Sequence, residues 1–208
     1  MAKKELSNRG NWQRESGPAG KSGRAEQNLI AVFTEYFKNS DYVIDAKPSD
    51  LKHIYDEKEL SKETLEKIFN PTEETMKNAR KRGWGITPDF CIRNKKTGKV
   101  LFGEIKRQDG WVENTKSTIG RGNAHERMCK LFTPGLTKKY REVSKITSKK
   151  ILPFWVVLQG DITRDPKRNR EIALWFDKYD KNYFMWRPDE DGKPLIEHFN
   201  NYLKKYLD

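Results

Sequence analysis

Apolar residues along the chain follow two spacings, and each spacing predicts one kind of element. Short runs rich in β-branched and aromatic residues predict strands, whereas apolar residues three or four positions apart predict helices that bury one face. The expected strands are residues 42–46, 90–92, 100–105, 151–158 and 183–186. Strands separated by helices predict the α/β class, with a mixed central β-sheet flanked by α-helices.

Helical spacing recurs through much of the remaining chain. The expected helices are residues 24–39, 48–56, 61–69, a stretch after Asn70-Pro71 that runs to Arg82, 123–132, 136–143, a face made by Ile172, Trp175, Phe176 and Tyr179, and 195–206. Residues 161–170 are expected to be a charged loop, and residues 108–122 a loop without apolar period. Residues 1–20 are polar and rich in Gly and Ser, which favours a flexible arm. No linker or repeat divides the chain, so residues 1–208 are expected to form one domain.

Three ionisable residues lie on the hairpin expected from residues 90–105. Asp89 opens its first strand, and Glu104 and Lys106 lie at the end of its second. Side chains two positions apart on a strand project from the same face, so Glu104 and Lys106 project together. Pairing of the two strands brings Asp89 beside them. The pattern predicts two carboxylates and one ammonium converging at one end of an apolar sheet.

That convergence suits metal-assisted phosphodiester hydrolysis. Two carboxylates are hard oxygen ligands for Mg²⁺, and a lysine beside the metal can orient a water or offset phosphate charge. Pro88-Asp89 followed by Glu104-Ile105-Lys106 matches the PD-(D/E)xK nuclease signature. Other acidic-x-Lys matches occur, among them Asp45-Ala46-Lys47, Asp56-Glu57-Lys58 and Asp165-Pro166-Lys167.

Context favours the hairpin over these rival matches. Only Glu104 and Lys106 end a run that is apolar on both faces, which is typical of an interior strand. The hairpin by itself leaves an ordinary solvated Glu/Lys pair equally open. Glu26, on the first expected helix, is interpreted as a helix-start charge in preference to a contact with the metal site.

Charge and cysteine content narrow the class of partner. The chain of 208 residues carries 42 Lys and Arg against 30 Asp and Glu, and this net charge of +12 favours a polyanionic partner. No apolar run is long enough to span a bilayer, and no membrane partner is expected. Cys91 and Cys129 have neither zinc-site nor disulfide-framework spacing, which indicates a reduced, intracellular protein.

A second informative stretch is Gly120-Arg121-Gly122-Asn123-Ala124-His125-Glu126-Arg127. Arg and Asn side chains read purine edges in the major groove, Glu accepts from an exocyclic amine, and Gly allows close backbone approach. The alternative is a capped helix start, with Asn123 as N-cap and Glu126 three residues later. Both interpretations stay open at the level of residue chemistry.

Residues 122–127 resemble the Gly-Asn-Ala-x-Glu-Arg block of the EcoRI restriction endonuclease. More of the chain is similar to the type II restriction endonucleases of the MunI group, which belong to the PD-(D/E)xK superfamily and cut CAATTG. The similar segments are residues 103–113, 120–127, 130–136, 151–157, 160–168 and 183–188. The similarity weakens in residues 55–82 and in the first twenty residues.

This resemblance implies a restriction-endonuclease-like domain that acts as a homodimer on double-stranded palindromic DNA. It implies Mg²⁺-dependent cleavage at CAATTG with 5′ AATT overhangs, with Asp89, Glu104 and Lys106 as catalytic residues and the two carboxylates as metal ligands. Its implied base readers are Arg121 for the outer pair and Asn123, Ala124, Glu126 and Arg127 for the inner AATT. Gly122, Lys116 and Lys130 are expected along the DNA backbone.

The same resemblance implies a prokaryotic cytoplasmic enzyme and a cognate methyltransferase that acts on the same site without having to bind this protein. Two other functions stay open from the residues themselves. One is a structure-selective repair or recombination nuclease of the same fold, and the other is a DNA-binding regulator without catalysis.

Overall fold

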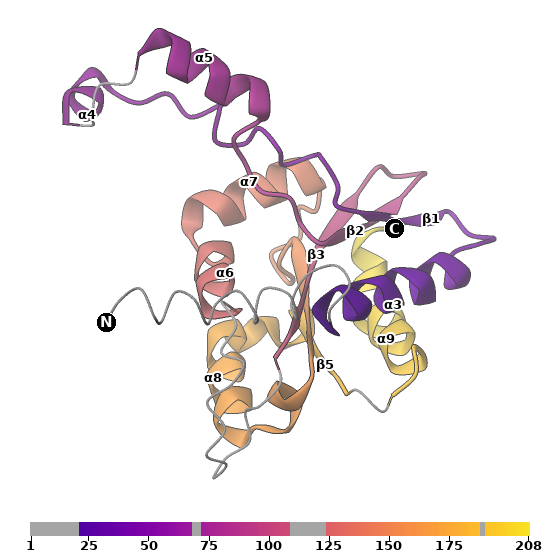
Figure 1. The fold of residues 1–208 in the computed structure, drawn as a ribbon. Helices are drawn as coiled ribbons and strands as arrows, with labels where there is room; N and C mark the ends of the chain where they lie inside the picture. Colours follow the sequence, from indigo (N-terminus) through magenta and orange to yellow (C-terminus); the bar gives the residue numbers. More distant parts are fainter. Residues whose placement is uncertain (1–20, 68–71, 109–123, 188–189) are drawn as a thin grey trace.

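A mixed five-stranded sheet forms the centre of the molecule (Figure 1). The structure, a computed structural model, describes residues 21–67, 72–108, 124–187 and 190–208. Its strands are β1 (Tyr42–Ala46), β2 (Phe90–Asn94), β3 (Val100–Arg107), β4 (Phe154–Gln159) and β5 (Tyr183–Trp186), which lie side by side in that order. Pairing is antiparallel from β1 to β3 and parallel from β3 to β5. The predicted α/β class with a mixed sheet is confirmed.

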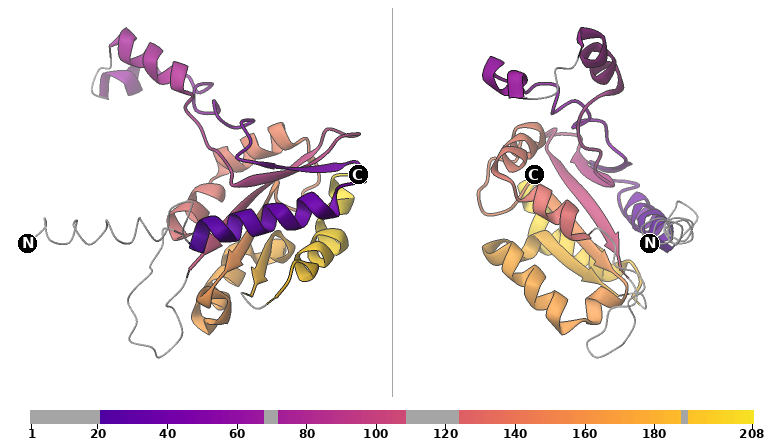
Figure 2. Two further views of the ribbon diagram at one scale, coloured as in Figure 1. Left: turned by 45° about the vertical axis from the view of Figure 1, so that its right-hand side comes forward. Right: turned by 60° about the vertical axis from the view of Figure 1, so that its left-hand side comes forward.

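Helices cover both faces of the sheet (Figures 1 and 2). The α-helices are α3 (Lys21–Tyr36), α4 (Lys62–Lys67), α5 (Glu73–Arg82), α6 (Ala124–Leu131), α7 (Pro134–Ser144), α8 (Pro166–Phe176) and α9 (Lys193–His198). Four shorter helical segments are η1 (Asp161–Arg164), η2 (Asp177–Asn182), η3 (Phe199–Leu203) and η4 (Lys204–Tyr206). Because α9, η3 and η4 follow one another directly, the predicted closing helix is confirmed. None of the helices in the described segments is long and apolar enough to cross a lipid bilayer.

Alternate residues of each central strand enter two separate core clusters. On β3, Leu101 and Ile105 pack in the cluster shared with α3 and α9, while Val100 and Phe102 pack in the cluster beneath α6, α7 and α8. Gly103 lies against the ring of Phe90, and a Cβ there would come within 2.1 Å of that ring. By the same alternation, Glu104 and Lys106 belong to the face that carries α6, α7 and α8.

The expected helix at residues 48–56 is wrong, because this segment is a succession of turns. Its local hydrogen bonds join residues three apart, such as Lys52 N–H to Ser49 O at 3.0 Å, and other backbone groups pair with a distant segment. Ile86 N–H donates to Leu51 O at 3.0 Å, and Tyr55 N–H donates to Trp84 O at 2.8 Å. Tertiary pairing with residues 84–86 therefore replaces the helical ladder. After these turns, α4 and α5 project away from the sheet (Figures 1 and 2).

The expected charged loop at residues 161–170 is also wrong, because η1 and the start of α8 occupy it. Asp165 is the N-cap of α8, and its Oδ1 accepts hydrogen bonds from Lys167 N–H at 2.9 Å and Arg168 N–H at 3.2 Å. Pro166 follows at the first helical position, where its missing N–H costs nothing. The Asp-Pro pair was the sequence signal for this helix, and the surrounding charges obscured it.

Candidate active site

The β2–β3 hairpin brings three ionisable side chains together at one end of the sheet. Phe90 pairs with Gly103, so Asp89, just before β2, comes beside Glu104 of β3. The ammonium Nζ of Lys106 lies 3.1 Å from Asp89 Oδ2 and 3.1 Å from Glu104 Oε2. The convergence expected from the sequence is therefore what the structure shows, with Lys106 bridging the two carboxylates.

Neighbouring lysines and a backbone amide keep the Asp89 carboxylate anionic despite its burial. Its side chain is 13% exposed, and that of Glu104 is 2% exposed. Burial raises the pKa of Asp89, but attraction by Lys106 and Lys47 and a hydrogen bond from Ile105 N–H to Oδ2, at 3.0 Å, outweigh it. The pKa of Asp89 consequently lies below its ordinary value. At neutral pH this carboxylate is a charged oxygen donor.

Lys47 is a further member of this cluster that the sequence did not reveal. It follows β1, and its Nζ lies 2.9 Å from Glu26 Oε2 and 3.1 Å from Asp89 Oδ1. Burial lowers the pKa of Lys47, but the hydrogen bond to Glu26 and the attraction of Asp89 raise it above its ordinary value. Glu26, interpreted from the sequence as a helix-start charge, is thus linked to Asp89 through Lys47. The link joins positions 26, 47 and 89, which no local pattern connects.

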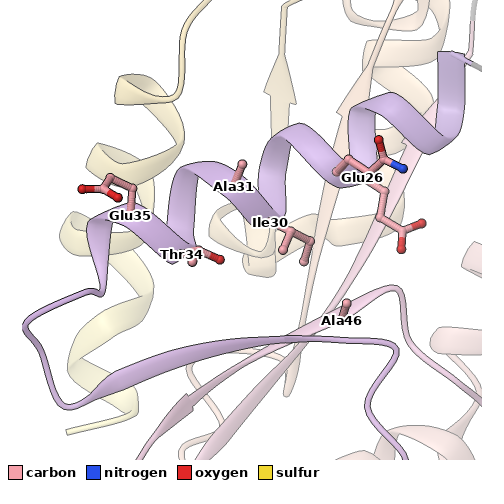
Figure 3. Close-up of a pocket in the computed structure, with 7 residues that line it drawn as sticks. Glu26, Ile30, Ala31, Thr34, Glu35 and Ala46 are labelled. Atoms are coloured by element: carbon pink, nitrogen blue, oxygen red, sulfur yellow. The ribbon is translucent and has the colours of Figure 1, made fainter.

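Glu26 also lines a shallow cavity of about 420 Å³ between α3 and the end of β1 (Figure 3). The other lining residues come from α3, except Ala46, which precedes Lys47. Figure 3 shows the Glu26 side chain projecting from α3 on the side of Ala46. The cavity is therefore next to the Glu26–Lys47 contact.

The carboxylates of Asp89 and Glu104 suit Mg²⁺ better than a metal whose ligands all come from protein side chains. Asp89 and Glu104 supply carboxylate oxygens, and no group of three or more His, Cys, Asp or Glu side chains suited to a metal ion occurs among the described residues. Mg²⁺ commonly takes one or two carboxylates and completes its shell with water and substrate oxygens. Two buried or nearly buried carboxylates beside a lysine meet that requirement.

Two rival acidic-x-Lys matches have other structural roles. Asp165 caps α8, as described above, and Asp56 accepts hydrogen bonds through Oδ2 from Trp84 N–H at 3.2 Å and contacts His53 Nδ1 at 2.8 Å. Asp45, in the third match, forms an ion pair with Arg93 at 3.6 Å. Lys47 of that match contacts Asp89, but Asp45 itself lies apart with Arg93, whereas in the Glu104-Ile105-Lys106 match the carboxylate and the lysine both belong to the Asp89 cluster.

The stretch expected to read bases lies largely outside the described residues. Lys116, Arg121, Gly122 and Asn123 fall there, while Ala124, Glu126 and Arg127 belong to α6 and Lys130 is exposed near its end. The helix expected at residues 123–132 is observed as α6 in its described part, and the expected N-cap Asn123 lies outside the described residues. On the sheet side, the buried Gln108 is fixed by two backbone hydrogen bonds, from its N–H to Gln159 O at 2.9 Å and from Ile162 N–H to its O at 3.1 Å.

Comparisons with known proteins point to one family along the whole chain. A model of the family described as type II restriction enzyme MunI matches residues 1–208. The type II restriction enzyme MunI of Mycoplasma sp. is 55% identical over 208 residues, which is 100% of each chain. The crystal structure of MunI restriction endonuclease in complex with cognate DNA is similar with a TM-score of 0.79 and 54% identity, covering 95% of this chain and 98% of that one.

Proposed function

This chain belongs to the MunI family of type II restriction enzymes and is a site-specific DNA endonuclease, and from that membership we propose that Asp89, Glu104 and Lys106 form its catalytic centre. The observation that carries the proposal is the position of Lys106 Nζ, 3.1 Å from one oxygen of each carboxylate. The family match extends over residues 1–208, so neither a repair nuclease nor a regulator has an observation in its favour.

Each of the three side chains has a distinct role in this proposal. Asp89 and Glu104 would hold a divalent cation, Mg²⁺, at the sheet end, where the hairpin positions both carboxylates. When bound, the cation supplies Lewis-acid stabilisation of charge on the scissile phosphate. Lys106 keeps the two carboxylates together and presents N–H donors that can orient the attacking water or offset charge on phosphate oxygens.

We further propose that the enzyme is a homodimer that cuts CAATTG and leaves 5′ AATT overhangs. Arg121 is assigned to the outer base pair, and Asn123, Ala124, Glu126 and Arg127 to the inner AATT. Gly122, Lys116 and Lys130 are assigned to the DNA backbone. A cognate methyltransferase would protect the same sequence by modifying it. The DNA-bound relative of 54% identity supports a DNA contact of this kind.

Alanine variants test the catalytic assignment. Asp89→Ala, Glu104→Ala and Lys106→Ala are each expected to slow cleavage of a plasmid with one CAATTG site roughly a thousandfold or more, because each removes several kcal/mol of transition-state stabilisation. The matched control is Asp180→Ala, which removes a half-exposed carboxylate paired only with Lys181 among the contacts described, at 2.6 Å. Near-wild-type cleavage by a folded variant of any of the three residues would contradict the assignment.

A further inference from the structure

Lys47, just after the edge strand β1, links α3 to the start of β2. Its ammonium contacts Glu26 of α3 and Asp89 at the start of β2, at 2.9 and 3.1 Å. Its backbone N–H donates to Asp89 O at 3.0 Å, which continues the β1–β2 pairing by one residue. Both the main chain and the side chain of Lys47 therefore contact Asp89.

The backbone of Lys47 bears a cost that its side-chain contacts must offset. Its φ of 50° lies in the left-handed region, which Gly adopts freely and side chains with a Cβ disfavour. A residue held in that region is stabilised by its surroundings, and such strain often occurs at functional sites. For Lys47 the surroundings are the two carboxylates. The strain is a second observation, independent of the ion pairs, that points to a role for this side chain.

The two carboxylate oxygens of Asp89 have different partners. Oδ2 accepts from Ile105 N–H and contacts Lys106 Nζ, at 3.0 and 3.1 Å, whereas Oδ1 contacts Lys47 Nζ. A backbone amide within the hairpin cannot swing away from Oδ2, but a half-exposed lysine side chain can leave Oδ1. A cation that binds Asp89 through Oδ1 therefore meets Lys47 as its competitor.

Resting on the proposed function of Asp89 as a metal ligand, we propose that Lys47 is a positioning residue of the nuclease site. Its ammonium holds the Asp89 carboxylate in place before a divalent cation binds, and it gives up Oδ1 to that cation while staying paired with Glu26. Glu26 acts through Lys47 and not as a ligand of its own. In Figure 3 the Glu26 side chain projects from α3 on the side of Ala46, the residue before Lys47, in agreement with the 2.9 Å contact between Glu26 and Lys47.

The proposal gives the two partners opposite effects on cation affinity. Without Lys47, a cation no longer competes with an ammonium for Oδ1 and binds more tightly. Without the charge of Glu26, Lys47 pairs with Asp89 alone and competes more strongly, so the cation binds more weakly. A merely structural role for either residue does not produce changes of opposite sign.

The test measures Mn²⁺ binding to the full-length, DNA-free protein by electron paramagnetic resonance of the free ion. Lys47→Met is expected to tighten binding about three- to fivefold, the effect of one partly exposed ion pair. Lys47→Arg keeps the charge and is expected to bind Mn²⁺ as wild type does. Lys47→Gly lacks the ammonium and suits a φ of 50°, so it is a second variant expected to show the tightening even if Lys47→Met folds poorly. Unchanged or weaker binding in the folded Met or Gly variant would overturn the proposal.

Glu26→Gln, made alone and together with Lys47→Met, completes a double-mutant cycle. We expect the single change to weaken Mn²⁺ binding and most of that effect to disappear when Lys47 is absent. An equal weakening in both backgrounds would mean that Glu26 acts on the cation directly, and it would overturn the positioning role.

Asp89→Ala separates this inference from the proposed function on which it rests. Loss of the Mn²⁺ site in this variant is expected and supports Asp89 as a ligand. Retention of the site would contradict the catalytic assignment itself, whatever the Lys47 variants show.

Discussion

Side chains of opposite charge alternate where the sheet meets the proposed active site. Glu26, Lys47, Asp89, Lys106 and Glu104 contact one another in that order, each at 2.9 or 3.1 Å. Burying a carboxylate without a partner is costly, and each buried acid here has a lysine beside it. The arrangement keeps two proposed metal ligands, Asp89 and Glu104, close together before any cation is bound. In our proposal Lys47 then has to leave Asp89 Oδ1 when the cation binds.

His198 is a second residue whose ionisation is set by its neighbours. Its ring stacks on Trp155 with the ring planes 8° apart, and its Nε2 lies 2.8 Å from Lys181 O. Burial lowers the pKa of His198, and the hydrogen bond to Lys181 O opposes this only in part. The folded protein thus binds a proton at His198 less readily than the unfolded chain does, for which the ordinary value is 6.5.

This difference predicts a loss of stability on the acidic side of neutrality. The contribution of neutral His198 is complete above pH 6.5 and declines as the pH falls from there toward the lowered pKa of the folded state, because protonation then favours unfolding. His198→Phe keeps an aromatic ring on Trp155 and removes the titration. Urea denaturation midpoints at several pH values from neutral to mildly acidic should fall more steeply for wild type than for His198→Phe. His53→Phe, at an exposed histidine, is the control and should keep the wild-type slope. Equal slopes for wild type and His198→Phe would contradict the prediction.

At the scale of elements, local sequence patterns predicted the elements whose contacts join residues close in the sequence. The β2–β3 hairpin followed from two apolar runs around a polar turn, and the sheet register then placed Asp89 beside Glu104. The turns at residues 48–56 did not follow, because Leu51 O pairs with Ile86 N–H, thirty-five positions later. The role of Lys47 was equally out of reach, since a φ of 50° and a contact with residue 26 leave no local signature.

The segment that precedes α6 in the sequence carries the prediction about sequence choice. Arg121 is proposed to read the outer guanine with a bidentate contact, which is worth roughly 1–3 kcal/mol of discrimination. Arg121→Ala should therefore lose cleavage or lose its preference at the outer pair while Asp89, Glu104 and Lys106 stay intact. Digestion of oligonucleotides with CAATTG, GAATTC, AAATTT and TAATTA by both proteins measures this. If wild type cuts GAATTC as readily as CAATTG, or the variant keeps its full preference, Arg121 is not the outer reader.

At the scale of the whole molecule, the excess of 42 basic over 30 acidic residues acts on DNA before any base is read. Phosphate contacts release counterions, so non-specific affinity should fall roughly 10³-fold or more between about 50 and 200 mM salt if six or more phosphates are contacted. Fluorescence anisotropy with a duplex lacking CAATTG measures the slope. Lys130→Ala, at an exposed position of α6, should reduce the slope by about one contact. Lys38→Ala, which changes a 67% exposed side chain beyond α3, should leave the slope unchanged. An affinity of the wild-type protein that does not vary with salt would rule out a surface that contacts many phosphates.

The proposed dimer can be tested by asking whether each subunit cuts one of the two DNA strands. Asp89, Glu104 and Lys106 contact one another within a single chain, so each subunit has the three side chains of one proposed catalytic centre. Two such centres related by a two-fold axis match the two strands of a palindrome. A heterodimer of wild type and Asp89→Ala should accordingly nick a plasmid that has one CAATTG site.

Such heterodimers can be isolated with two different tags on the N-terminus. The C-terminus is unsuitable, because Lys99 donates to the backbone oxygen of Asp208 and Tyr42 donates to its carboxylate. A tagged wild-type dimer should linearise the plasmid, whereas the mixed dimer should accumulate open circles, since its second strand has no active centre. Linear product at the wild-type rate would mean that one centre cuts both strands. Absence of nicking would mean that a centre needs Asp89 of both subunits, and either result would contradict independent catalytic centres.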